Sequence, residues 1–150
     1  MRAVIQRVSQ ASVSIDEKKV AAIHDGLLVF LGIEIQDTKE DSEWLANKIS
    51  SLRIFSDKDG KMNRSVTEVN GEVIVVSQFT LHAKTKKGTR PSYIKASRPE
   101  HAIPLYEQFK KDLSDVIGKE VQSGEFAADM KVSLTNDGPV TIIIDTKNKE

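Results

Sequence analysis

The sequence predicts a single domain of the α+β class that spans residues 1–150. Short apolar or alternating runs predict strands near both ends and in the middle of the chain. Two longer segments repeat apolar residues at helical spacing, and they lie between the strands. The length is that of one ordinary domain, and no linker or internal repeat divides the chain.

The N-terminal third is expected to form strands. Residues 2–15 alternate between apolar and polar side chains. Arg7 departs from this pattern because its neighbours on the same face are apolar, so it lies at a sheet edge or pairs with a specific partner. Residues 20–24 predict a short strand, and residues 27–31 predict a strand that is buried on both faces. Asp25-Gly26, between these two runs, predicts a hairpin turn.

Two helices are predicted. The first opens within residues 36–42, where Thr38 and Asp41 match a capping box. Its core-facing stripe consists of Leu45, Ile49 and Leu52. The second is predicted to start with a cap at Ser97 and to end at Gly118.

An apolar, β-branched run at residues 73–76 predicts the central buried strand. The following residues are more polar. If the strand continues, Gln78 and Thr80 point to one side, and Ser77 and Phe79 to the other. This end either presents hydrogen-bonding groups at the mouth of a pocket or merely marks where the strand meets water.

Charge is balanced overall, with 22 basic and 22 acidic residues, which argues against a wholly basic nucleic-acid-binding protein. The distribution is uneven, however, because no acidic residue lies between Glu72 and Glu100. The basic residues of that segment are Lys84, Lys86, Lys87, Arg90, Lys95 and Arg98. They form either a solvated loop or a site that holds phosphates by charge.

Near the C-terminus, residues 130–135 and 140–145 predict two strands joined by residues 136–139. Gly138-Pro139 in this joint is either a plain turn or a cis peptide, since an X-Pro bond pays only about 0.5–1 kcal/mol to be cis. A cis Gly-Pro directs its carbonyl groups in ways that an ordinary loop does not, and such carbonyls can occupy the space of a substrate substituent.

Common catalytic signatures are absent from the sequence. It contains no nucleophile elbow, phosphate-binding loop or zinc-protease motif, and no metal-ligand spacing. Residues 56–61 resemble the start of a calcium loop but lack the later acidic ligands. Ser77 and His82 form a dyad only if the strand breaks between them. There is no cysteine and no membrane-length apolar run, and the first residues lack a signal-peptide core. We therefore expect a cytoplasmic protein.

Two motifs resemble the signature pair of the D-aminoacyl-tRNA deacylase family: Ser77-Gln78-Phe79-Thr80-Leu81 and Asn136-Asp137-Gly138-Pro139-Val140-Thr141. The resemblance covers essentially the whole chain, including residues 1–8, 87–93 and 98–100. One departure is Ala127, because the family usually carries glycine after the residue that matches Phe126. This departure affects the wall on the adenosine side of the pocket.

The resemblance implies a small β-barrel-like sheet with flanking helices, and a homodimer without metal or organic cofactor. It implies hydrolysis of the ester that links a D-amino acid, or glycine, to the tRNA 3′ end. Gly138 and Pro139 would enter the active site of the other subunit and reject L-amino acids sterically, with Arg7 fixing this pair. The remaining implied site residues are Ser77, Gln78, Phe79 and Thr80 around the aminoacyl group, and Phe126 and Met130 beside the terminal adenosine.

Two accounts of the chemical step remain open. Thr80 is either an activated nucleophile, although the sequence shows no base for it, or backbone N–H groups near Phe79 and Thr80 hold the oxyanion while the ribose 2′-hydroxyl assists water. The second account needs no missing side chain and is preferred. The rival functions are a non-catalytic RNA-binding protein that uses residues 84–98, and an esterase acting on small molecules.

Overall fold

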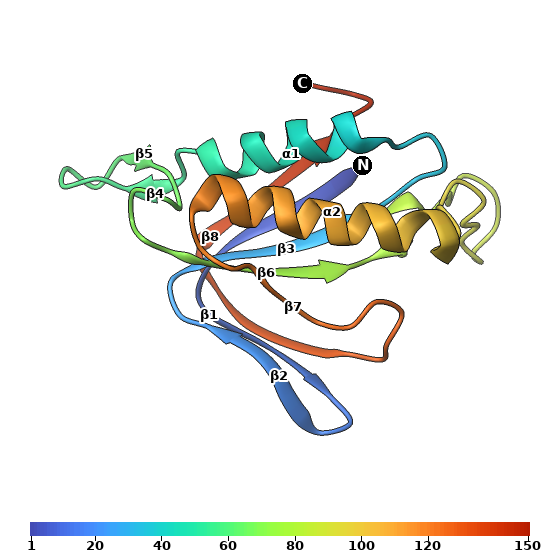
Figure 1. Ribbon diagram of the computed structural model, residues 1–150, viewed down its shortest axis with the longest axis horizontal. Coiled ribbons are helices and arrows are strands. Elements are labelled where there is room, and N and C mark those ends of the chain that lie inside the picture. The colour runs from blue at the N-terminus through green and yellow to red at the C-terminus, as the bar shows by residue number, and fades with distance from the viewer.

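The computed structural model describes residues 1–150, and Figure 1 shows two helices packed on one side of a strongly curved sheet. The sheet contains β1 (Arg2–Ile15), β2 (Lys18–Ile23), β3 (Gly26–Gly32), β6 (Glu72–Ser77), β7 (Gln122–Ser123) and β8 (Lys131–Asp145). The other elements are α1 (Lys39–Ser51), α2 (Pro99–Ile117), the short 3₁₀ helix η1 (Phe79–His82), and a small ribbon of β4 (Phe55–Ser56) and β5 (Met62–Arg64).

Strand β1 organises the sheet because it pairs with three other strands. Strand β8 runs antiparallel along one edge of β1, whereas β3 and then β2 follow one another along the other edge. Strands β6 and β7 continue the sheet beyond β3 in parallel pairings. Strands β2 and β7, at the two ends of the strand order, then approach each other, since the Ala22 N–H of β2 donates to Gln122 Oε1 of β7 at 2.9 Å. The fold is therefore α+β, with a nearly closed, barrel-like sheet and two helices.

Both faces of the central strands are buried. Leu27 and Val29 of β3 lie in the core between the sheet and the helices, whereas Leu28 lies in a second core inside the curved sheet. Val75 and Ile74 of β6 divide in the same way. The prediction of strands buried on both faces is thus confirmed for both apolar runs.

The helices begin and end largely as the sequence predicts. Thr38 is the N-cap of α1, and the capping box with Asp41 is formed. Gly118 ends α2 with a left-handed φ of 71°, a conformation that glycine adopts at low cost. Ser97 is not the cap of α2, because that position belongs to Arg98; the Ser97 hydroxyl instead contacts His101 Nδ1 at 2.6 Å.

The hairpin predicted at Asp25-Gly26 is wrong. Ala11 pairs with Ile23 and Val8 with Gly26, so the chain continues along the same edge of β1 without reversing. Glycine is needed at position 26 for close packing, because a Cβ there would lie 1.8 Å from the Glu72 carbonyl oxygen.

The two predicted C-terminal strands form one interrupted strand, β8, whose halves both pair with β1. Gln6 pairs with Thr141 and Val8 with Asn136. Between these pairs β1 has one residue, Arg7, whereas β8 has the four residues 137–140. Those residues therefore loop out of the ladder opposite Arg7.

Candidate active site

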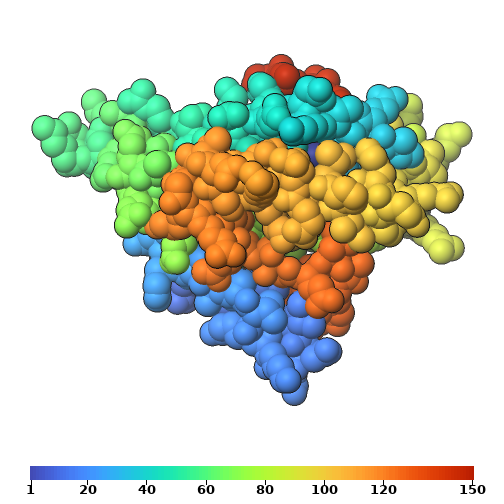
Figure 2. Space-filling model, viewed as in Figure 1, coloured from blue at the N-terminus to red at the C-terminus, as the bar shows by residue number.

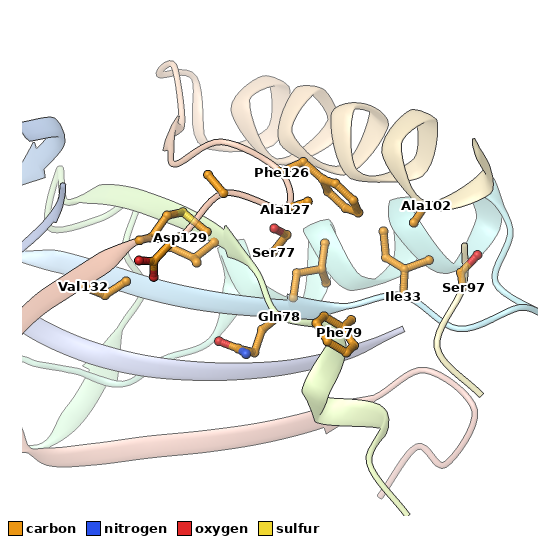
Figure 3. A pocket seen from close by; sticks show the side chains of 14 residues that line it. Ile33, Ser77, Gln78, Phe79, Ser97, Ala102, Phe126, Ala127, Asp129 and Val132 are labelled. Atoms are coloured by element: carbon orange, nitrogen blue, oxygen red, sulfur yellow. The ribbon is translucent and has the colours of Figure 1, made fainter. Parts of the chain in front are cut away.

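A pocket of about 350 Å³ opens where β3 and β6 end, beneath the start of α2. Figure 3 shows Ser77, Gln78 and Phe79 on one side, with Phe126 and the connector that follows it on the other. The full lining is Leu31, Ile33, Val76, Ser77, Gln78, Phe79, Ser97, Ala102, Phe126, Ala127, Ala128, Asp129, Met130 and Val132. Most of these side chains are apolar, and the polar ones are Ser77 and Gln78 at the end of β6, together with Ser97 and Asp129.

The chain changes direction at Gln78, where strand β6 gives way to the 3₁₀ helix η1. The Gln78 N–H still donates to the Leu31 carbonyl at 2.8 Å, as the last contact of the sheet. Strand β6 ends at Ser77 and η1 begins at Phe79, so the alternation expected through Thr80 does not occur. A 3₁₀ helix offers no internal acceptor to its first N–H groups. The Phe79 and Thr80 N–H groups are therefore available to a ligand.

The Thr80 side chain is bound to its neighbour instead of lining the pocket. Gln78 Nε2 donates to Thr80 Oγ1 at 2.5 Å, and no carboxylate, imidazole or amine contacts this hydroxyl. The strand does break after Ser77, but no hydrogen bond joins Ser77 to His82, which is buried with Nε2 unpartnered. Neither hydroxyl has a base, so these side chains do not form a serine- or threonine-hydrolase dyad.

The opposite wall is held by packing. The ring centroids of Phe126 and Tyr106 lie 5.7 Å apart. The Tyr106 hydroxyl donates to the Val75 carbonyl at 3.1 Å. Burial raises the pKa of Tyr106 to about 12, so this phenol remains a neutral donor. Met130 sits against Gly124, where a Cβ would lie 2.2 Å from the Met130 sulfur.

Ala127 occupies a position that suits glycine. Its φ is +64°, in the left-handed region where a Cβ is unfavourable. This residue lines the pocket between Phe126 and Met130. The departure noted in the sequence therefore falls at a position where the backbone favours glycine.

The Gly138-Pro139 bond is cis and forms the tip of the loop that leaves β8. Asn136 spans the loop, because its Oδ1 accepts from the Val140 N–H at 2.9 Å and its Nδ2 donates to the Val140 carbonyl at 3.2 Å. Arg7 supports the loop from inside through Nε, which donates to the Asp137 carbonyl at 3.1 Å. Its Nη1 donates to the Ile54 carbonyl at 2.6 Å.

Arg7 thus has specific partners inside the fold, and the alternative of a residue at the sheet edge is excluded. The arginine is 9% exposed and also lies 3.3 Å from the Asp137 carboxylate. Gly138 and Pro139 themselves are exposed and do not line the pocket of their own chain.

The structure brings five predicted residues around one pocket: Ser77, Gln78, Phe79, Phe126 and Met130. Gly138 and Pro139 lie apart from it, in a loop that Arg7 supports from β1. Several residues of the lining were not predicted as site residues, among them Ile33, Ser97 and Asp129. Asn136 and Asp137 appeared only as part of a motif. Asn136 was the available signal, since a short amide side chain beside Gly-Pro often bonds the backbone of its own turn.

No group of three or more His, Cys, Asp or Glu side chains is arranged to hold a metal ion. None of the helices combines the length and the apolar character needed to cross a bilayer.

Comparison with known proteins assigns this architecture to a family. A family profile described as D-Tyr-tRNA(Tyr) deacylase matches residues 4–145. D-aminoacyl-tRNA deacylases of Flavobacterium psychrophilum and Bacteroides fragilis are 67% and 64% identical to the chain, over all 150 residues and the full length of each relative. A solved structure titled c-Myc DNA Unwinding Element Binding Protein has a TM-score of 0.92 and 39% identity, covering 97% of this chain and 98% of its own.

A second solved structure, of a probable eukaryotic D-amino acid tRNA deacylase, has a TM-score of 0.82 at 17% identity, and covers 95% of this chain and 97% of its own. At that identity the likeness concerns the fold alone. The family profile and the two bacterial relatives carry the assignment, because they match nearly the whole chain. The chain therefore belongs to the D-Tyr-tRNA(Tyr) deacylase family.

Proposed function

We propose that the protein hydrolyses the ester of D-aminoacyl-tRNA, and of glycine mischarged on tRNA, in the cytoplasm. The observation that carries this proposal is the pair of unpartnered N–H groups at Phe79 and Thr80, at the edge of a pocket with an aromatic wall at Phe126. An aminoacyl ester is already reactive, so orientation and oxyanion stabilisation supply the main part of the catalysis.

In the proposed reaction, water attacks the ester carbonyl carbon and forms a tetrahedral intermediate. The Phe79 and Thr80 N–H groups donate to its oxyanion. The neighbouring 2′-hydroxyl of the terminal ribose assists the attacking water and relays its proton to the 3′-oxygen. The ester C–O bond then breaks, giving a free amino acid and tRNA with a free 3′-hydroxyl. Ser77 and Gln78 line the side of the pocket that receives the aminoacyl group.

The wall formed by Phe126 and Met130 is proposed to hold the terminal adenosine. Phe126 provides an aromatic surface for a base, and Tyr106 fixes its ring from behind. Met130 adds an adaptable apolar contact on the same wall.

Chiral selection is proposed to come from a homodimer. The Gly138-Pro139 loop is exposed, projects from β8 and is held by Arg7 and Asn136, which suits a rigid element that enters the pocket of the partner subunit. Its main-chain carbonyls would occupy the place of an L side chain. Glycine has no side chain, so this filter admits it.

The test is a deacylation assay with matched D-tyrosyl-, L-tyrosyl- and glycyl-tRNA, together with the mass of the protein in solution. We expect release of D-tyrosine and glycine but not of L-tyrosine, and a dimer. Equal rates on the D and L esters, or a monomer that still discriminates between them, would contradict the steric filter.

A non-catalytic RNA-binding protein is the second candidate. It is favoured by the basic segment at residues 84–98 and by the absence of a base beside Thr80. Salt-dependent tRNA binding without ester turnover in the same assay would select it. Hydrolysis of small aminoacyl esters at an undiminished rate, without any tRNA, would select a small-molecule esterase.

A further inference from the structure

One surface of the molecule carries an unbalanced charge. Residues 84–98, called the basic loop below, contain six basic side chains and no acidic one: Lys84, Lys86, Lys87, Arg90, Lys95 and Arg98. All six are exposed. None takes part in an ion pair, although nine such contacts occur elsewhere in the chain. An anion that binds here therefore breaks no existing ion pair.

The basic loop projects at one end of the molecule. Figure 1 shows it beyond the N-terminal end of α2, and Figure 2 shows the same yellow segment standing out from the surface. Two acidic residues lie where the loop joins the body: Glu34, which pairs with Ala96 across an isolated bridge, and Glu100 in the first turn of α2. The charged side chains of the loop itself are all positive.

The base of the basic loop is built into the mouth of the pocket. Lys84 and Ser92 exchange two backbone hydrogen bonds, of 2.8 and 3.0 Å, which close the segment that carries Lys86, Lys87 and Arg90. At the other end the Ser97 N–H donates to the Ile33 carbonyl at 2.9 Å, and both residues line the pocket.

An aromatic contact also joins the basic loop to the pocket. The Tyr93 ring meets Phe79 edge-on at 5.0 Å between centroids, and Phe79 lines the pocket. Tyr93 therefore connects the wall of the pocket to the charged segment. Partly exposed aromatic rings beside basic side chains are typical of surfaces that follow a nucleic-acid strand.

We propose that the basic loop binds the phosphate backbone of the tRNA acceptor arm next to the 3′ end. The inference rests on the proposed function, because the pocket must take the aminoacylated terminus for the loop to meet the phosphates that follow it. The protein has no net charge, so it attracts RNA only where cations are concentrated. Such contacts bind without reading sequence, and release of counterions makes them depend on salt.

The test compares two double variants on two substrates. Lys86→Gln/Lys87→Gln removes two charges from the basic loop. Lys18→Gln/Lys19→Gln removes two adjacent, exposed and unpaired lysines where β2 starts, far from the loop in Figure 1. The substrates are D-tyrosyl-tRNA and D-tyrosyl-adenosine, which has the same ester without acceptor-arm phosphates. KM and kcat are measured between about 50 and 200 mM salt.

For Lys86→Gln/Lys87→Gln we expect KM for D-tyrosyl-tRNA to rise about tenfold at low salt, with kcat within about twofold. The slope of log KM against log salt should become shallower by about 1.5. The ratio of the variant KM to the wild-type KM should therefore shrink about eightfold over this salt range. D-tyrosyl-adenosine should be hydrolysed at the wild-type rate. Lys18→Gln/Lys19→Gln should resemble wild type on both substrates.

Three results would overturn the inference while leaving the proposed function intact. They are an unchanged KM and salt slope for the loop variant, equal effects of the two double variants, and an equal loss on D-tyrosyl-adenosine. Failure of the wild-type protein to hydrolyse either substrate would overturn the proposed function itself.

Discussion

Arg2 holds Asp145 through Nε at 3.0 Å and Nη2 at 2.8 Å, both donating to the same carboxylate oxygen. Its third nitrogen, Nη1, donates to the Leu81 carbonyl at 2.7 Å. One guanidinium therefore connects the start of β1, the end of β8 and η1. Because η1 carries the Phe79 and Thr80 N–H groups, this contact also supports the proposed oxyanion site.

We expect Asp145→Asn to lower the free energy of unfolding by about 1 kcal/mol, since the pair is partly exposed. The variant also leaves Arg2 without its anion, so η1 should become less well fixed and kcat should fall several-fold. Urea unfolding and single-turnover deacylation measure the two effects. Asp115→Asn, which breaks an exposed pair with Lys111 in α2, is the control and should change neither quantity appreciably.

The same carboxylate predicts how stability depends on pH. Partial burial tends to raise the pKa of Asp145, but hydrogen bonds from Arg2 and the Lys147 N–H outweigh it, and the pKa lies below its ordinary 3.8. The folded state therefore binds this proton less readily than the unfolded chain. Its stabilisation is present above pH 3.8 and is lost as pH falls through the folded pKa.

The pKa of Asp41 is also lowered in the folded state, so this carboxylate likewise stabilises the fold less as pH falls. Burial tends to raise its pKa, but hydrogen bonds from Lys147, Thr146 and Thr38 lower it far below the usual range. We expect the free energy of unfolding to fall from pH 5 toward pH 2. The difference in this free energy between wild type and Asp145→Asn should become smaller over the same interval. A constant difference would show that the pair does not titrate as described.

Arg7→Lys tests the support of the Gly138-Pro139 loop. Lysine keeps the charge but cannot serve both the Ile54 and Asp137 carbonyls with the geometry of a guanidinium. We expect a loss of about 1–2 kcal/mol in stability and a fall in the preference for D over L esters. Arg53→Lys, at an exposed arginine that bonds Asn63, is the matched control. If Arg7→Lys keeps the wild-type preference for D over L esters, Arg7 does not contribute to chiral selection.

Ala127→Gly should stabilise the protein. A left-handed φ costs a non-glycine residue about 1–2 kcal/mol, and the greater freedom of glycine in the unfolded chain offsets about 0.4–1 kcal/mol of the gain. A net rise of about 0.5–1 kcal/mol corresponds to about 1–4 °C in Tm for a chain of this size. Ala128→Gly, beside it but without positive φ, should destabilise. Destabilisation by both substitutions would contradict this account.

The pattern of apolar and polar residues predicted most of the fold, because buried positions require apolar side chains. The apolar runs that became β3 and β6, and the capping box of α1, depend on neighbouring residues alone. Gly26 misled the interpretation, because glycine serves a turn and a close packing contact equally well. Only the partner strand, which approaches within the space of a missing Cβ, distinguishes these two uses.

Five of the residues that the sequence singled out line one pocket, but their arrangement was not predictable. A strand and a 3₁₀ helix are both compatible with the motif after Val76, and the tertiary bond from Gln78 to Leu31 marks where one gives way to the other. Arg7 shows the same limit. Its sequence signal was a charge on an apolar face, whereas its partners, Ile54 and Asp137, lie 47 and 130 residues away.

Thr80→Ala distinguishes the two chemical accounts. The Thr80 hydroxyl accepts from Gln78 and has no base, so its removal should cost only the anchoring of the Gln78 amide, about 1 kcal/mol or less than tenfold in kcat. Thr80→Ser, which keeps the hydroxyl, should resemble wild type. If Thr80 is an activated nucleophile, kcat should instead fall by several orders of magnitude in Thr80→Ala and recover in Thr80→Ser. Both substitutions leave the Thr80 N–H in place, so these side-chain variants, compared by single-turnover hydrolysis of D-tyrosyl-tRNA, separate the two accounts.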